Sequence, residues 1–144
     1  MAERIELTSG LREYELYFKD RDATVTIAFN PADTGMAVRL NEFESRVNEK
    51  LKGLTDIELD ANGMPKDMSF IDNIKLINKS LSEELDRAFG NKISDKVFAF
   101  CDPLATIDGK YFVLQFIEQI TPVMKRCIER ENKALQKHIA GYRK

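Results

Sequence analysis

Apolar and polar residues alternate in two short stretches near the start of the chain. The apolar positions of residues 12–18 and 23–29 are Tyr14, Leu16, Phe18, Val25, Ile27 and Phe29. A period of two is typical of strands that bury one face. Because the polar link at residues 19–22 is short, we predict a β-hairpin over residues 12–29.

Residues 3–8 carry a weaker alternation, with Ile5 and Leu7 as the apolar positions. A strand here, followed by a turn at Ser9-Gly10, would extend the hairpin to a small meander. A lone hairpin is marginally stable in water. We therefore expect the hairpin to pack on a helix or to find another strand, so self-association through its edge is an open alternative.

The period changes to that of a helix directly after Phe29. The recurring apolar positions are Met36, Leu40, Phe43, Val47, Leu51 and Leu54. Asn30 can cap this helix, Pro31 suits its first position and Asp33 suits its first turn. With Gly53 as the stop, we predict a helix over about residues 31–53.

Three further helical segments follow. One spans residues 69–89, with Ser69 or Asp67 as its cap and Gly90 as its stop. A short helix is predicted over residues 94–101, and a long one over residues 109–141 with a break at Pro122. The apolar stripe of this last helix is Tyr111, Phe112, Phe116, Ile120, Val123, Cys127 and Ile128.

These elements predict the fold class α+β. The chain has 144 residues, which favours a single domain over residues 1–144. Apolar residues make up 43% and charged residues 32%, a balance that argues against a disordered chain. We expect an N-terminal β-hairpin or small meander packed on a bundle of three to four helices.

Charge and hydropathy limit the function classes. The net charge is −2, so no global field attracts nucleic acid or an anionic membrane. No apolar run approaches the roughly 20 residues that span a bilayer, and the start of the chain lacks an apolar signal region. We therefore expect a cytoplasmic protein without membrane contact, in which Cys101 and Cys127 are unpaired thiols on helix faces.

No catalytic, cofactor-binding or metal-binding motif stands out. Phosphate-cradling loops and metalloprotease or hydrolase motifs are missing. The loop at residues 58–69 approaches a calcium loop but places Glu58 and Ser69 where the pattern needs Asp and a bidentate Glu. His138, the single histidine, favours an exposed imidazole near a helix end. We expect a non-enzymatic protein, with an enzyme of unrecognised site as a minor alternative.

The C-terminal part of the chain is basic. Residues 122–144 hold seven Lys and Arg against two Glu, a net charge of +5. The basic residues that recur along one side of the predicted helix are Arg126, Arg130, Lys133 and Lys137. They fit a nucleic-acid contact, an acidic protein partner, or simply a helix end that complements its dipole. Tyr142 is the one aromatic residue in this stretch, which argues against stacking on nucleic-acid bases.

The order of several short motifs resembles that of a known family. The chain shows the hairpin, Phe29-Asn30-Pro31-Ala32-Asp33 at the start of a helix that carries Arg39 and Phe43, then Phe89-Gly90, a helix that ends in Thr121-Pro122, and a basic tail at residues 138–144. Across nearly the whole chain this order is similar to small tail assembly chaperones encoded by phages and prophages of Gram-positive bacteria.

The resemblance implies a non-enzymatic binding protein without a cofactor. Such chaperones are expected to coat the long helical tape measure protein and to recruit tail tube subunits during tail assembly. The partner-binding residues that we select on the last helix are Phe116, Ile120, Arg126, Arg130, Lys133 and Lys137. The alternative is a small nucleic-acid-binding or regulatory phage protein that uses this basic helix.

Overall fold

The hairpin that opens the fold has the strands and register that the alternation predicts. The computed structural model describes residues 1–52, 54, 58–66 and 68–142. Strands β1 (Arg12–Phe18) and β2 (Ala23–Phe29) pair antiparallel, with Tyr14 opposite Ile27 and Leu16 opposite Val25. Opposite residues share a face, so the apolar side chains all point to the helices. Residues 1–11 form no strand, so the meander that we considered over residues 3–8 is not present.

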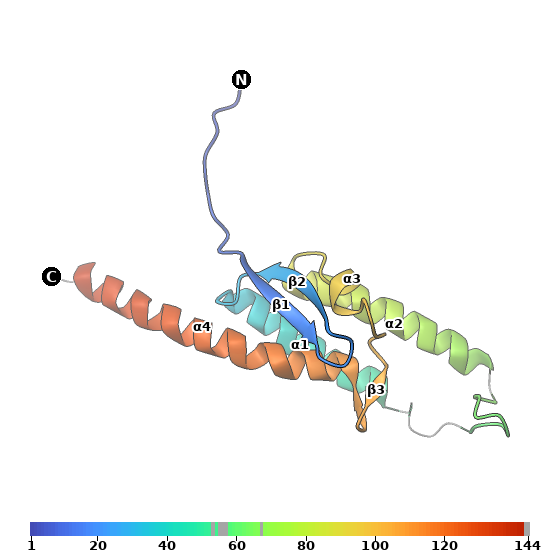
Figure 1. Ribbon diagram of the computed structural model, residues 1–144. Coiled ribbons are helices and arrows are strands. Elements are labelled where there is room, and N and C mark those ends of the chain that lie inside the picture. Colours follow the sequence, from blue (N-terminus) through green and yellow to red (C-terminus); the bar gives the residue numbers. More distant parts are fainter. Residues whose placement is uncertain (53, 55–57, 67, 143–144) are drawn as a thin grey trace.

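Four helices complete the fold. They are α1 (Thr34–Leu51), α2 (Met68–Phe89), the short α3 (Ser94–Val97) and α4 (Phe112–Tyr142). The hairpin lies across them as a separate layer, and α4 runs along one side of α1 (Figure 1). A two-strand hairpin followed by four helices confirms the predicted α+β class. The predicted spans of 31–53, 69–89 and 109–141 correspond to α1, α2 and α4.

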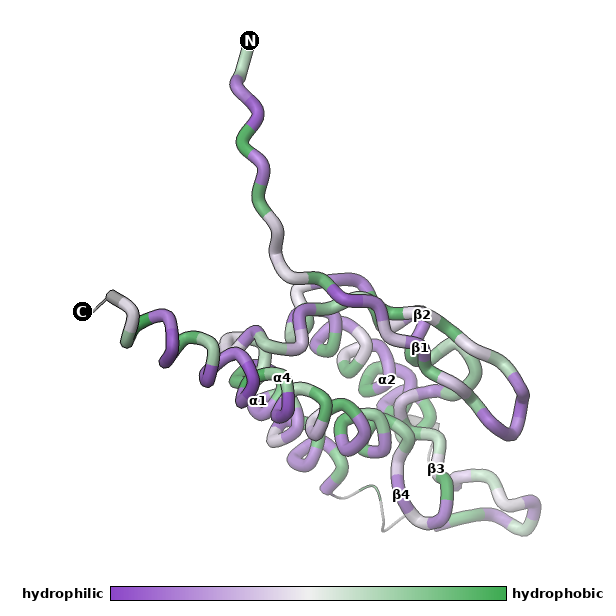
Figure 2. The backbone as a smooth tube through the Cα atoms, turned by 60° about the vertical axis from the view of Figure 1, so that its left-hand side comes forward, coloured by the Kyte–Doolittle hydropathy of each residue, from purple (hydrophilic) through white to green (hydrophobic). Residues whose placement is uncertain are grey.

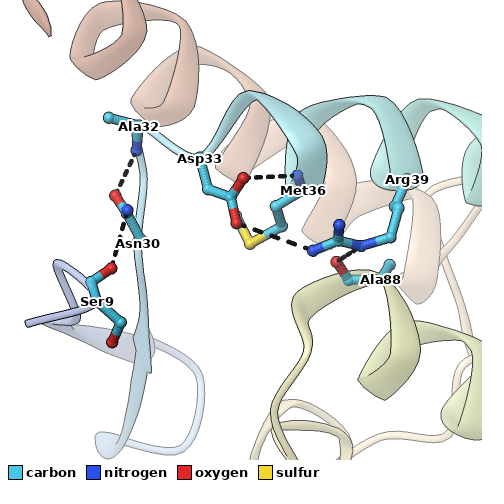
Figure 3. Close-up of polar contacts among 7 residues, drawn as sticks. All are labelled: Ser9, Asn30, Ala32, Asp33, Met36, Arg39 and Ala88. Carbon is cyan, nitrogen blue, oxygen red and sulfur yellow. Dashed lines mark hydrogen bonds and ion pairs between the residues drawn. The ribbon is translucent and has the colours of Figure 1, made fainter.

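The turn between β2 and α1 corrects the predicted helix start. Asn30 does not cap α1; its Oδ1 accepts a hydrogen bond from the Ala32 N–H at 2.9 Å and so caps the Pro31 turn. Asp33 is the N-cap, since its Oδ1 accepts from the Met36 N–H at 3.2 Å (Figure 3). Because Pro31 and Ala32 are used in this turn, α1 begins at Thr34. The predicted stop at Gly53 lies outside the described residues.

Arg39 ties the start of α1 to the end of α2. Its Nε donates to the Ala88 carbonyl oxygen at 3.0 Å, and its guanidinium lies 3.9 Å from the Asp33 carboxylate (Figure 3). The end of α2 follows the predicted pattern. Gly90 has φ +64°, the Gly90 N–H donates to Arg87 O and the Asn91 N–H donates to Asp86 O, which is the Schellman arrangement.

The predicted caps and the short third helix need correction. α2 begins at Met68, so Ser69 lies inside the helix and not before its first residue, and Asp67 lies outside the described residues. α3 ends at Val97, so the predicted helix over 94–101 is too long. The chain turns there because Phe98 packs edge-on against Phe112 and Phe100 against Phe18, which a continued helix would not allow.

A second, very short hairpin precedes α4, which therefore begins later than predicted. Strands β3 (Thr106–Ile107) and β4 (Lys110–Tyr111) are joined by Asp108 and Gly109, both with positive φ. This is the backbone of a primed two-residue turn, for which Asp-Gly is a favoured sequence.

The predicted break at Pro122 is wrong. α4 continues through Pro122, which leaves the Glu118 carbonyl without its helical N–H partner. Both residues are exposed, so water can satisfy that oxygen. Ile120 and Met124, on either side of Pro122, are 5% and 3% exposed, and their burial holds the two halves in one helix.

We predict that Asp33→Ala lowers the free energy of unfolding by about 1 kcal/mol, since the Met36 N–H loses its cap. Asp33→Asn is the matched control, because it keeps the capping oxygen but removes the charge facing Arg39. Urea unfolding should place Asp33→Asn within about 0.5 kcal/mol of the parent. Equal losses in both variants would mean that the ion pair, and not the cap, is what matters.

Candidate partner-binding surface

The first half of α4 is built into the core. Phe116 is 6% exposed and packs against Phe89 of α2 with ring centroids 6.0 Å apart. Ile120 is 5% exposed. These two residues were selected from the sequence as partner-binding, and the structure corrects that selection: their side chains hold the fold together and are not available to a partner.

The four selected basic residues behave differently. Arg126, Arg130, Lys133 and Lys137 are exposed, and their spacing of four, three and four residues places them on one side of α4. The structure therefore brings these four together as predicted, and separates them from Phe116 and Ile120. We call them the basic row.

The second half of α4 extends beyond the rest of the molecule. Every residue from 129 to 141 is exposed, and the helix runs past the hairpin and α1 toward the C-terminus (Figures 1 and 2). Leu135 and Ile139 are 54% and 49% exposed. Leu135 follows Ile128 by seven residues and Ile139 follows Leu135 by four, so the side of α4 that is buried at Met124 carries these two uncovered apolar residues further along. We call Ile128, Leu135 and Ile139 the α4 stripe.

A groove between α1 and α4 leads into this stripe. It has a volume of about 420 Å³, and its apolar lining includes Ala37 and Leu40 from α1 with Met124 and Ile128 from α4. Charged and polar residues border it, namely Asn41, Glu44, Thr121, Lys125 and Glu129. Because Ile128 belongs to both features, the groove and the α4 stripe lie along one side of α4, with the polar residues Glu131 and Asn132 between Ile128 and Leu135.

Leu135 and Ile139 were missed in the sequence. The apolar stripe predicted for the last helix ends at Ile128, although Leu135 follows seven residues later and Ile139 four residues after that. Periodicity could have found these residues. Their exposure depends on where the other elements end, which periodicity does not indicate.

The pKa of Tyr14, which lies beside α4, is shifted from its usual value. Tyr14 of β1 stacks on Phe29 with centroids 4.9 Å apart. Burial raises the pKa of Tyr14 above its usual 10.0, and the neighbouring Cys127 on α4 adds to the increase. The phenol therefore reports on the packing of the hairpin against α4.

The remaining candidate groups show structural roles. Asp60 accepts hydrogen bonds from the Asn62 and Met64 N–H groups at 2.9 and 3.0 Å, so this calcium-like loop is organised as a turn. Within the described residues, no three His, Cys, Asp or Glu side chains are grouped to hold a metal ion. Cys101 and Cys127 are both unpaired thiols, but Cys101 follows α3 in a bend and lies on no helix.

A scan against protein-family models and searches of curated proteins and of solved structures found no match to this chain. A function is therefore inferred from the surface described above and from the motif order of the sequence. In the part of the chain that is described, no helix is long and apolar enough to cross a membrane.

Substitutions on the two sides of α4 should separate core from surface. We predict that Ile120→Ala lowers the free energy of unfolding by about 2–5 kcal/mol, because it leaves a cavity in the core. Lys133→Ala should change it by less than about 0.5 kcal/mol. Denaturant unfolding of both variants checks this, and a small loss for Ile120→Ala would contradict the placement of α4.

Tyr14 should give the protein a pH-dependent stability. Its folded-state pKa is raised, so its contribution is complete below its usual 10.0 and is lost as the pH rises through the folded value. We predict that Tyr14→Phe makes the decline of stability above pH 10 shallower than in the parent. The difference in tyrosinate absorbance between the parent and the variant, followed as the pH is raised, measures the pKa of Tyr14 directly. A value at or below 10.0 would contradict the raised pKa.

Proposed function

We propose that this protein is a tail assembly chaperone that binds a tape measure protein along α4. The observation that carries the proposal is that the α1–α4 groove and the exposed Leu135 and Ile139 lie along one side of a helix that extends from the core. The motif order that resembles phage tail assembly chaperones supports the same choice of partner. The proposed role is binding and release, without a catalytic step.

The shape of the surface suits a long amphipathic helix. Such a partner exposes an apolar stripe, and α4 presents a matching stripe beside which a second helix can lie. Leu135 and Ile139 are each about half exposed, so covering them contributes roughly 1 kcal/mol per side chain. That contribution is moderate, as a chaperone needs when its client must later leave.

Charge favours an acidic client. The basic row offers four positive charges on the projecting helix, on a different side from the α4 stripe. A client seated on the α4 stripe would leave these charges on the far side of the helix, where they attract an acidic client at longer range and speed encounter more than they increase affinity. In this proposal the protein acts in the cytoplasm of the host cell and also meets tail tube subunits after the tape measure is coated.

The α4 stripe can be tested with a charge-matched pair of variants. We predict that Leu135→Asp with Ile139→Asp weakens binding of the purified tape measure protein at least tenfold, since two carboxylates would have to be desolvated. Gln136→Asp with Ala140→Asp is the control, because it adds the same charge to the same exposed turns off the stripe. Calorimetry or interferometry measures both affinities.

Comparison of the two double variants distinguishes loss of the apolar surface from a general effect of added negative charge. Equal weakening in both double variants would assign the effect to charge and would exclude the α4 stripe as the docking site. Unchanged binding in both would exclude this half of α4 altogether.

At the level of the genome, a tail tube gene upstream and a very long tape measure gene downstream would be expected.

The basic row also supports a second candidate, a nucleic-acid-binding or regulatory phage protein. Four exposed cations at helical spacing can follow a phosphate backbone. Such binding would fall steeply with salt, and Lys133→Ala with Lys137→Ala would reduce the salt slope. Leu135→Asp with Ile139→Asp would weaken the client complex in the first candidate, whereas the lysine substitutions would have the larger effect in the second.

A further inference from the structure

The N-terminal segment, residues 3–9, has the pattern of a strand but no partner. Ile5 and Leu7 are 80% and 91% exposed, and they alternate with Arg4 and Glu6. Figure 2 shows this alternation of hydrophobic and hydrophilic residues along an extended stretch that leaves the body of the molecule. Two large apolar side chains in full contact with water favour any arrangement that covers them.

The point at which this segment leaves the body is held in place. The Ser9 carbonyl oxygen accepts a hydrogen bond from Asn30 Nδ2 at 3.0 Å (Figure 3). The Gly10 N–H donates to Thr8 Oγ1 at 3.2 Å. Gly10 has φ +78°, and a Cβ there would lie 2.9 Å from Asn30 Nδ2. The chain therefore needs glycine at this hinge, which directs the segment away from its own hairpin (Figure 1).

The hairpin has the complementary feature, an edge without a strand. β2 is β1's single strand neighbour, so the opposite edge of β1 has no strand among the described residues. The far edge of β2 is different, because α3 packs beside it and Asn91 Nδ2 donates to the Ala28 carbonyl oxygen at 2.9 Å. An unpaired strand edge is a template for another strand.

The side-chain pattern fits an antiparallel pairing on β1 with the apolar residues on the inner face, and we take the register in which residue 5 lies opposite residue 14. If Ile5 lies opposite Tyr14, Leu7 lies opposite Arg12 and both apolar side chains join the inner face, where Tyr14 and Leu16 are only half-buried. On the outer face Arg4 then lies opposite Glu15, an attractive pair, and Glu6 lies opposite Glu13, a repulsive pair that water screens. A shift by one residue would turn Arg4 and Glu6 inward, so the alternation selects this face.

We propose that two copies of this chain exchange their N-terminal segments, each adding residues 3–9 to the β1 edge of the other. The partner is a second copy of this chain because every chain supplies one unpaired segment and one open β1 edge. The hinge at Gly10, where Asn30 holds the Ser9 carbonyl oxygen, directs the segment outward. Reciprocal exchange closes the pair with twofold symmetry and leaves neither edge unpaired. This inference does not depend on the proposed chaperone function.

A cross-strand disulfide tests the pairing and the register together. In the proposed register residue 6 lies opposite residue 13, both on the exposed outer face. Glu6→Cys with Glu13→Cys should give, after mild oxidation, a disulfide-linked species at twice the 16.5 kDa chain mass on a non-reducing gel. Glu6→Cys with Tyr17→Cys is the control, because Tyr17 shares that face but lies four residues away along the strand.

The outcomes divide clearly. Each single variant reports the background from Cys101 and Cys127. An intramolecular link between the two introduced thiols, seen as a monomer with one disulfide by mass spectrometry, would overturn the exchange in favour of a segment that folds back on its own chain. Equal crosslinking in test and control variants, or none, would also overturn it.

Sedimentation gives a second, independent measurement. Ile5→Asn with Leu7→Asn should convert the dimer to a monomer, whereas Glu6→Asn, on the outer face, should leave the dimer intact. All three side chains are exposed in the single chain, so folding is not at risk. A parent chain that stays monomeric at tens of micromolar, or a dimer that survives the Ile5 and Leu7 substitutions, would refute the proposal.

Discussion

The packing of Phe29 is the contact on which the rest of the structure depends. Its ring is 0% exposed, stacks on Tyr14 within the hairpin and meets the edge of Phe89 with centroids 5.4 Å apart. Phe89 in turn contacts Phe116 of α4. This series of rings joins the hairpin, the end of α2 and the first half of α4, so a marginal two-stranded sheet becomes part of one core.

The same packing determines which part of α4 stays uncovered. The hairpin and α1 are both shorter than α4, which has 31 residues, and they cover it only as far as about Ile128. Beyond this point residues 129–141 are all exposed, Leu135 and Ile139 among them. The proposed client surface and the proposed strand exchange have a common origin, because in both an element with an apolar face extends past the core that could have covered it.

Periodicity predicted the hairpin and α1 with their buried faces, and the span of α2, since those signals depend on local spacing. It was wrong where tertiary packing overrode a local signal. Pro122 did not break α4, because Ile120 and Met124 are buried on either side of it. The β3–β4 hairpin was not predicted despite its Asp-Gly turn, because its two-residue strands are too short to show an alternation of apolar and polar residues. For the candidate site, periodicity predicted that the basic row shares one side of α4, and its role in binding stays a prediction. Phe116 and Ile120 were misassigned, because periodicity shows which residues share a face and not what covers that face.

Hydrogen exchange along α4 tests the central claim most directly. The account predicts slow exchange for amides of residues 116–124 in the protein alone and fast exchange for residues 130–141, where no other element covers the helix. Addition of the tape measure protein should protect residues 130–141 and leave the first half unchanged. Protection that appears elsewhere, with residues 130–141 still exchanging fast in the complex, would contradict the claim that this half of α4 is the docking surface.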